Sequence, residues 1–202
     1  SSAFTARRFA PGRARVVYIG VPHPRPTESR LDLRPGRRTI GLVGNLCPRK
    51  GQLDALPALE QVLEARDDVD VAFVGRVAGP VAMTLSDRAA ASGGRIRMLG
   101  WVPDVADHFH EFALVVVPSR SEGFGRVAVE SLRAGVPVLA TRIEGLTEAL
   151  RDVSDPWLPD TRQHWAERIL RELEQPSHSP DALRAAAHRF DPERYTDEVL
   201  DC

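Results

Sequence analysis

A single lysine lies where it could neutralise a bound anion. Lys50 is the only lysine among 27 basic residues, and it belongs to the glycine-flanked segment 44–51. This segment follows an apolar run (39–43) and directly precedes an amphipathic stretch (52–66). A cation beside a helix N-terminus is unfavourable unless an anion lies between them, since the helix dipole is positive there. The position indicates an anion-binding loop, while a solvated surface lysine would fit the same pattern.

Two glutamates flank a second candidate segment, 118–130, which follows the apolar run 114–117. Glycines at 123 and 125 let the N–H groups at the start of the next helix approach a phosphate closely. Glu130 lies about five residues into that helix, ~7–8 Å along its axis. That separation matches the distance from a nucleotide's phosphates to its ribose hydroxyls. Glu122 lies on the loop side, where a sugar attached to a diphosphate would sit, although two glutamates at this spacing also occur by chance.

The same segment fits another phosphate-binding pattern. Residues 123–128 read Gly-x-Gly-x-x-Ala, and Glu144 follows about twenty residues later, as in a nicotinamide-dependent dehydrogenase. That fingerprint should directly follow the first strand of its domain. Here residues 118–122 separate it from the preceding apolar run. We therefore interpret the match as accidental.

A sheet has to position these segments. Amphipathic stretches predict helices at 52–66, 81–91, 105–112, 125–134 and 146–151. Short β-branched runs predict strands at 15–19, 39–43, 69–74, 96–99, 114–117 and 137–140. This alternation predicts an α/β fold, a Rossmann-like doubly wound parallel sheet with helices on both faces. Ligands bind beyond the carboxyl ends of such strands, which is where both candidate segments begin.

The flanking regions differ from this centre. Residues 20–38 carry four prolines and little apolar periodicity, so they are predicted to be a linker. Strand signals stop after about residue 152, and the remaining pattern predicts helices at 162–174, 180–188 and 192–200.

Composition excludes several function classes. The 202 residues carry a net charge of −1, which argues against a general nucleic-acid binder. Cys47 and Cys202 are far apart and the six histidines are scattered, so no metal site is predicted and a reducing compartment fits. No apolar run approaches the ~20 residues of a transmembrane helix. We expect a cytoplasmic chain, either free or peripheral at the inner membrane.

The ordered set of segments resembles the C-terminal, donor-binding domain of GT-B glycosyltransferases of family four, which retain anomeric configuration. The family pattern Ser-Glu-Gly-Phe-Gly, with seven residues between two glutamates, corresponds to residues 121–125 with Glu122 and Glu130. The pattern Gly-Arg-Leu-x-Pro-x-Lys-Gly corresponds to 44–51. Further matches lie at 99–104, 118–119, 135–138 and 144–148, and the likeness covers roughly residues 15–200.

The resemblance implies transfer of a hexose from a nucleotide diphosphate sugar, a UDP- or GDP-sugar, to an acceptor hydroxyl without a metal or other cofactor. Lys50 would pair with the diphosphate, and Glu130 would bind the ribose. Glu122 would contact the transferred sugar near the reacting centre, so Glu122 and Lys50 are the implied catalytic residues. The implied donor-binding residues are Asn45, Lys50, Val74, Arg76, Trp101, Val102, Gly123, Phe124, Gly125, Arg126, Val127 and Glu130.

The resemblance also implies a division of the chain. Residues 1–35 correspond to the end of an N-terminal domain and a linker, 36–178 to the donor-binding domain, and 179–202 to helices that pack back toward an N-terminal domain. That domain, which binds the acceptor, lies outside this chain, so the isolated chain is expected to be inactive. The chain departs from the family at Asn45, where a second diphosphate-binding arginine is usual, and at Glu144, where a glycine is common.

Other functions remain open at this point. A non-catalytic nucleotide-sugar-binding subunit, paired with a separate acceptor-binding chain, would carry the same segments. A GT-B-type sugar-nucleotide epimerase shares the fold but is disfavoured by the run at 121–125.

Overall fold

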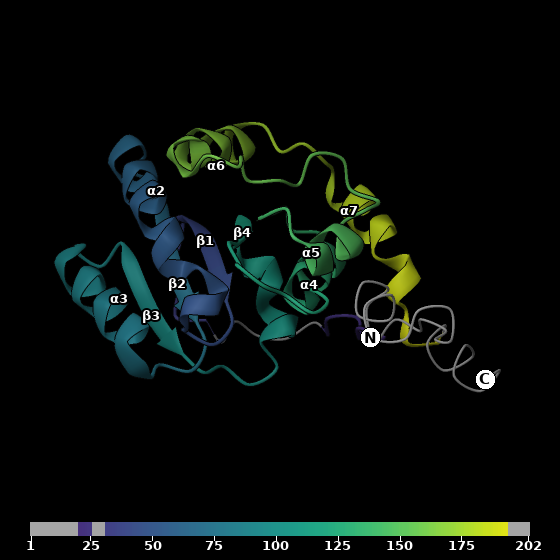
Figure 1. Cartoon of the computed structure of the whole chain (residues 1–202), viewed down its shortest axis with the longest axis horizontal. Coiled ribbons are helices and arrows are strands. Elements are labelled where there is room, and N and C mark those ends of the chain that lie inside the picture. The colour runs from purple at the N-terminus through teal and green to yellow at the C-terminus, as the bar shows by residue number, and fades with distance from the viewer. Residues whose placement is uncertain (1–19, 26–30, 194–202) are drawn as a thin grey trace.

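A computed structural model describes residues 20–25 and 31–193 of the chain. Five parallel strands form one sheet in the order β3-β2-β1-β4-β5, which confirms the predicted Rossmann-like α/β fold (Figure 1). The order reverses between β1 and β4, which pair directly through Ile40 and Leu114. The strands are β1 (Arg38–Val43), β2 (Val69–Val74), β3 (Ile96–Gly100), β4 (Leu114–Val117) and β5 (Val138–Ala140).

Helices cover both faces of this sheet. The strand side chains alternate between the two faces, so each face has its own hydrophobic core. Ile40, Leu42 and Phe73 pack with helices α2, α3 and α6. Val74 and Val117 point the other way and pack with α4, α5 and α7. The helices are α2 (Gln52–Ala65), α3 (Gly79–Ala91), α4 (Arg126–Ala134), α5 (Glu144–Ala149), α6 (Trp165–Glu174) and α7 (Pro180–Ala186).

Two expected helices take a different form. The stretch expected at 105–112 is a 3₁₀ helix, η2 (Val105–Glu111), which begins after Asp104 in a left-handed conformation (φ 49°). The stretch expected at 162–174 begins as a short 3₁₀ turn (Arg162–His164) and continues as α6. The strand expected at 15–19 lies outside the described residues, as does most of the helix expected at 192–200.

The predicted linker and the C-terminal helices pack together. Val21 is buried, and its N–H donates to the carbonyl oxygen of Phe190 at 2.8 Å. Leu183 of α7 and Phe190 share one hydrophobic core with Val129 of α4. The segments on either side of the sheet domain thus meet beside α4.

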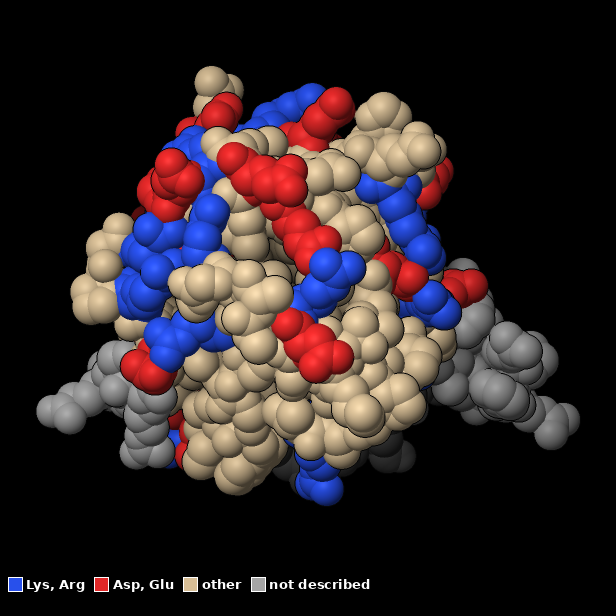
Figure 2. Space-filling view, turned by 90° about the vertical axis from the view of Figure 1, so that its left-hand side faces the viewer, with Lys and Arg blue, Asp and Glu red and all other residues tan. Residues whose placement is uncertain are grey.

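The face over β3 and α3 carries charges of both signs. In Figure 2, acidic and basic side chains mix over its upper part, and uncharged side chains cover most of its lower part. This mixture agrees with the near-zero net charge. Among the residues that the structure describes, no helix is both long and apolar enough to cross a membrane.

Candidate functional site

The loops after β1 and β4 meet where the strand order reverses. The first loop ends in a 3₁₀ turn (Pro48–Lys50) and turns into α2 at Gly51, whose φ is 69°. A Cβ at Gly51 would lie 1.8 Å from the carbonyl oxygen of Pro118, so glycine permits this close approach. A backbone hydrogen bond of 2.9 Å from Arg120 to Arg49 joins the loops further. Such a reversal is where ligands bind in doubly wound folds.

Lys50 and Glu122 form an ion pair across this junction. The Lys50 Nζ donates to the Glu122 Oε2 at 2.7 Å, and both side chains are 13% exposed. Arg49 adds a second cation, with its Nη1 3.5 Å from the same oxygen. Arg49 also donates to the carbonyl oxygen of Ser121 at 2.9 Å. The Glu122 carboxylate is therefore held by two cations from the other loop, and the Lys50 charge is balanced within the protein.

Helix α4 begins directly after the second loop. Gly125, with φ 80°, precedes the helix, and no side chain among the described residues caps its N-terminus. The first N–H groups of a helix have no partner within it, so those of Arg126 and Val127 can serve a phosphate. A Cβ at Gly125 would lie 2.7 Å from Leu146 of α5, so this position also requires a residue without a side chain. The loop thereby delivers the helix start to the ligand side of the sheet.

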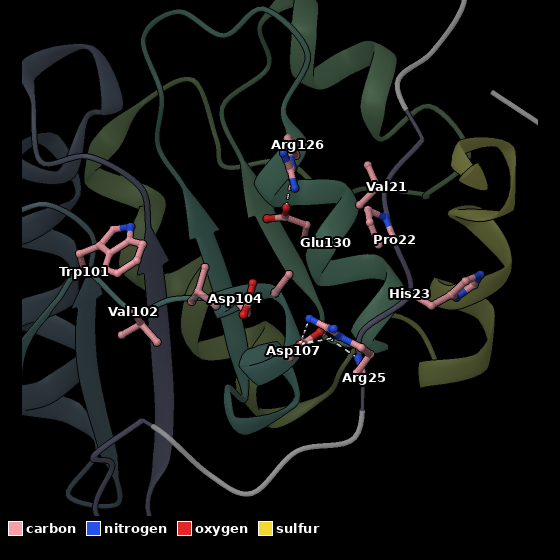
Figure 3. Close-up of a pocket in the computed structure, with 12 residues that line it drawn as sticks. Val21, Pro22, His23, Arg25, Trp101, Val102, Asp104, Asp107, Arg126 and Glu130 are labelled. Atoms are coloured by element: carbon pink, nitrogen blue, oxygen red, sulfur yellow. Dashed lines mark hydrogen bonds and ion pairs between the residues drawn. The ribbon is translucent and has the colours of Figure 1, made fainter. Parts of the chain in front are cut away.

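Glu130 lies one turn further along α4. Its side chain is 8% exposed, and it accepts a hydrogen bond from the Arg126 Nε at 2.7 Å (Figure 3). Burial raises the pKa of the Glu130 carboxyl, and the Arg126 guanidinium opposes this only in part. Since Arg126 is largely exposed, the charge of Glu130 is poorly compensated. Hydroxyl donors would stabilise such a carboxylate.

Glu130 and Arg126 line a cleft of about 670 Å³. Residues 21–25, which belong to the predicted linker, form one wall, and the loop between β3 and η2 forms another (Figure 3). Trp101, which is 70% exposed, and Val102 line it as well. Arg25 and Asp107 close one end through an ion pair of 3.3 Å. The cleft is large enough for a small organic ligand and has a buried carboxylate at its edge.

The structure brings only part of the expected donor set to this cleft. Trp101, Val102, Arg126 and Glu130 line it, whereas Lys50 and Glu122 pair with each other at the junction of the loops after β1 and β4. The remaining expected residues, which do not line it, are Asn45, Val74, Arg76, Gly123, Phe124, Gly125 and Val127.

The surroundings of three of these residues explain their places. Val74 is buried in the core, and Arg76 is exposed in the loop after β2. Phe124 packs edge-on against Phe190, with 5.2 Å between the ring centroids. The side chain of Phe124 therefore packs against the protein and anchors the loop.

Sequence reasoning missed the linker and η2 side of the cleft, including the ion pair between Arg25 and Asp107. Arg25 lies in the predicted linker, where there is no periodicity to interpret, and Asp107 lies in a stretch expected to be an ordinary helix. No spacing signal could have linked them, because 82 positions separate them. No group of three metal-ligating side chains occurs in the part of the chain that the structure describes.

Comparison with known proteins decides the family. The family model for glycosyl transferases group 1 matches residues 37–175. The chain belongs to this family. The matched range contains both loops, α4 and the β3–η2 loop, and thus most of the site described above.

Relatives and solved structures agree with this family. A D-inositol 3-phosphate glycosyltransferase of Segniliparus rotundus is 31% identical over 164 residues, covering 78% of this chain and 36% of that protein. The lipopolysaccharide core biosynthesis mannosyltransferase LpsB of Rhizobium meliloti is 30% identical over 130 residues, covering 62% of this chain and 37% of that protein. The structure of Anabaena HepE with UDP and glucose has a TM-score of 0.71 and 25% identity, and the match covers 82% of this chain and 48% of HepE. The chain spans less than half the length of each of these proteins.

Proposed function

We propose that this chain supplies the donor-binding half of a retaining glycosyltransferase, which transfers a hexose from a nucleotide diphosphate sugar to an acceptor hydroxyl. The observation that carries the proposal is the 2.7 Å pair between Lys50 and Glu122 at the reversal of strand order. A cation for the diphosphate and a carboxylate for the sugar thereby lie beside each other. Glu130 lies in the adjoining cleft, where the nucleoside of the same donor would bind.

Each part of the donor has a complementary group. The ribose hydroxyls donate to the buried Glu130 carboxylate, and the base lies against Trp101 and Val102. The phosphates accept from the N–H groups at the start of α4 and from Lys50. Asn45 donates at most a neutral hydrogen bond, so Arg49, which lies 3.5 Å from the Glu122 carboxylate, serves as the second cation for the diphosphate. The UDP bound to HepE, a protein of the same fold, supports a nucleotide sugar as the donor, with a UDP-sugar and a GDP-sugar as the two candidates.

The chemistry follows from where charge develops. The bond between the anomeric carbon and the diphosphate oxygen breaks, and its electron pair stays on the diphosphate. Negative charge grows there in the transition state, where Lys50 and the α4 amides stabilise it. The acceptor oxygen forms the new bond to the same carbon and passes its proton to the departing diphosphate oxygen. Glu122 accepts hydrogen bonds from hydroxyls of the sugar and thereby orients it.

A non-catalytic nucleotide-sugar-binding subunit is the second candidate. The Lys50–Glu122 pair and the cleft at Glu130 would bind the donor in such a subunit as well, without any transfer by this chain. In both candidates the acceptor is bound mainly by a further domain or chain. Activity assays on the chain alone, and together with an N-terminal half from a family relative, would separate the two. Transfer that appears on adding that half and is lost in Glu122→Gln supports the catalytic role, whereas transfer that does not depend on Glu122 supports the binding subunit.

Calorimetric titration with UDP, GDP, ADP and TDP tests the proposed donor site. One nucleotide should bind at least about tenfold more tightly than the weakest, because a cleft that hydrogen-bonds one base leaves polar groups unpaired with another. The Glu130→Gln variant should weaken that binding. Arg88→Gln, an exposed substitution on α3, is the matched control and should change nothing. If none of the four nucleotides binds, the donor-site proposal fails.

A further inference from the structure

A second hollow lies at the carboxyl ends of β4 and β5. It has a volume of about 230 Å³ and is bordered by the loops after both strands, the start of α2 and the segment leading into α6. None of the expected donor-binding residues lines it. The side chains that line it include Asp54, Ser119, Arg120, Arg142, Arg162 and Trp165.

Two of the arginines share one carboxylate. Arg120 makes a two-pronged contact with Asp54 at 2.6 and 2.7 Å, and Arg162 donates to the same carboxylate at 2.8 Å. The hydrogen bond from Arg120 holds the pKa of the Asp54 carboxyl below its ordinary value, so Asp54 stays ionised. Each guanidinium carries five N–H donors, and both therefore keep donors for a further partner.

The third arginine has no such partner. Arg142 lies over the ring of Trp157, with 5.1 Å between the guanidinium carbon and the ring centroid. Among the described residues, no carboxylate lies within ion-pair distance of it. Asp160 is the other acidic residue that lines the hollow. Three guanidinium groups thus face two carboxylates, and one positive charge is in excess.

A buried hydroxyl is also left without a partner. Ser119 is 1% exposed, and its Oγ makes no hydrogen bond to any residue that the structure describes. Its carbonyl oxygen, by contrast, accepts from the Thr141 Oγ1 at 2.5 Å, so the backbone there is held in place. Buried hydroxyl groups nearly always have a hydrogen-bond partner. An acceptor atom in the hollow would provide one.

We propose that this second hollow binds the phosphate group of a phosphate monoester. Arg142 supplies the uncompensated charge, Arg120 and Arg162 supply further N–H donors, and Ser119 supplies its hydroxyl. A phosphate oxygen accepts several hydrogen bonds at once, and planar guanidinium groups match its geometry. The site is separate from the proposed donor site, and it stands whether or not that proposal holds.

Tryptophan fluorescence can report on this hollow. Trp165 lines it and Trp157 stacks with Arg142, while the third tryptophan, Trp101, lies in the donor cleft. The experiment uses the full 202-residue chain carrying Trp101→Phe, titrated with inorganic phosphate at constant ionic strength. We expect a saturable change that Arg142→Gln weakens about tenfold or more, since it removes a charged hydrogen bond. Ser119→Ala should weaken it by a smaller factor.

Matched variants separate the two sites. Arg88→Gln on α3 removes an exposed arginine elsewhere and should leave the titration unchanged. Lys50→Gln removes the donor-site cation and should change the apparent affinity by less than about twofold, as for independent sites. A response lost in Lys50→Gln but kept in Arg142→Gln would overturn the proposal. If Arg142→Gln does not fold, Arg142→Met replaces it, since this variant also removes the charge and keeps a long side chain beside Trp157.

A second arm identifies the source of the monoester. Vesicles of phosphatidylcholine with and without phosphatidate are sedimented with the same proteins. Arg142-dependent binding in either arm supports the proposal, and the arm in which it occurs shows whether the ester is soluble or carried by a lipid. A linear response to phosphate together with no vesicle binding, or binding in both arms that ignores Arg142, would show only adventitious ions and refute it.

Discussion

Glu122 and Glu130 are the same chemical group at two ends of one segment, yet the protein treats them differently. Glu122 lies on a loop and is held by Lys50 and Arg49, which come from another loop. Glu130 lies inside α4 and has one mostly exposed partner, Arg126, from its own helix. Burial raises the pKa of Glu130, because Arg126 compensates its charge only in part.

The difference indicates how a ligand would interact with each carboxylate. Glu122 is paired before any ligand arrives, so a ligand must share or replace its contact with Lys50. Glu130 is destabilised until hydroxyl donors reach it, so ligand binding relieves part of a cost already present in the fold. The Glu122–Lys50 pair on the loops should therefore govern affinity for the charged diphosphate. Glu130 in α4 should affect both the affinity for the nucleotide and the stability of the fold.

The largest effect should come from Lys50→Ala. Affinity for the best-bound nucleoside diphosphate should fall about ten- to hundredfold, since a hydrogen bond to a charged group contributes ~1.5–3 kcal/mol. Calorimetry at fixed salt measures it. The control is Arg151→Ala, an exposed arginine after α5.

Two outcomes of this experiment separate the loop end from the rest of the molecule. A loss confined to Lys50→Ala, with unchanged thermal unfolding, places the effect in binding. Unchanged affinity in a folded Lys50→Ala protein would remove Lys50 from the site and leave Arg49 as the remaining cation beside Glu122.

Glu130→Gln should have a smaller effect on the same affinity, a loss of about tenfold. Glutamine still accepts from one ribose hydroxyl but brings no charge, so one charge-assisted bond becomes neutral. The affinity for the free nucleotide and for the intact nucleotide sugar should fall by the same factor, because both carry the ribose. A loss seen only with the sugar-bearing donor would contradict the assignment.

The buried charge of Glu130 should lower the stability of the original protein relative to Glu130→Gln, and the size of this difference should depend on pH. Because the pKa of Glu130 is raised in the folded protein, the folded state binds this proton more tightly than the unfolded chain. The contribution of Glu130 to the free energy of unfolding therefore falls as pH rises from its ordinary pKa through the raised one. Glu130→Gln removes this term, so its stability relative to the original protein should increase across that window and then level off.

Urea unfolding at several pH values between about 4 and 8 measures this difference, with the linear extrapolation applied at each pH. Arg126 is largely exposed, so the loss of its ion pair costs little. A difference that stays constant with pH would show that Glu130 is adequately compensated in the folded state.

Much of this arrangement could be predicted from the sequence, because buried parallel strands appear as continuous apolar runs. The run 114–117 became β4, and the switch to amphipathic stretches predicted the helices on both faces. The family of the chain followed from the ordered motifs, and the family model confirms it. These features depend on local pattern and order along the chain.

Contacts between loops could not be predicted in the same way. The direct pair between Lys50 and Glu122 depends on how closely Gly51 passes Pro118, which no periodicity encodes. The wall of the cleft formed by Arg25 and Asp107 joins a linker to a 3₁₀ helix. Such contacts arise from tertiary packing of irregular segments, where residue type alone leaves many partners possible.

The smallest expected effect on a free nucleotide belongs to Glu122→Gln, and it is the sharpest test of the comparison. Glu122 contacts the sugar in the proposed donor complex, so a nucleoside diphosphate without sugar loses no partner. The substitution also releases Lys50 from a competing carboxylate at 2.7 Å. Affinity for the free nucleotide should therefore stay within about twofold or rise, whereas affinity for the nucleotide sugar should fall about tenfold. Equal losses of free-nucleotide affinity in Glu122→Gln and Glu130→Gln would show that the two glutamates do not divide sugar from nucleoside.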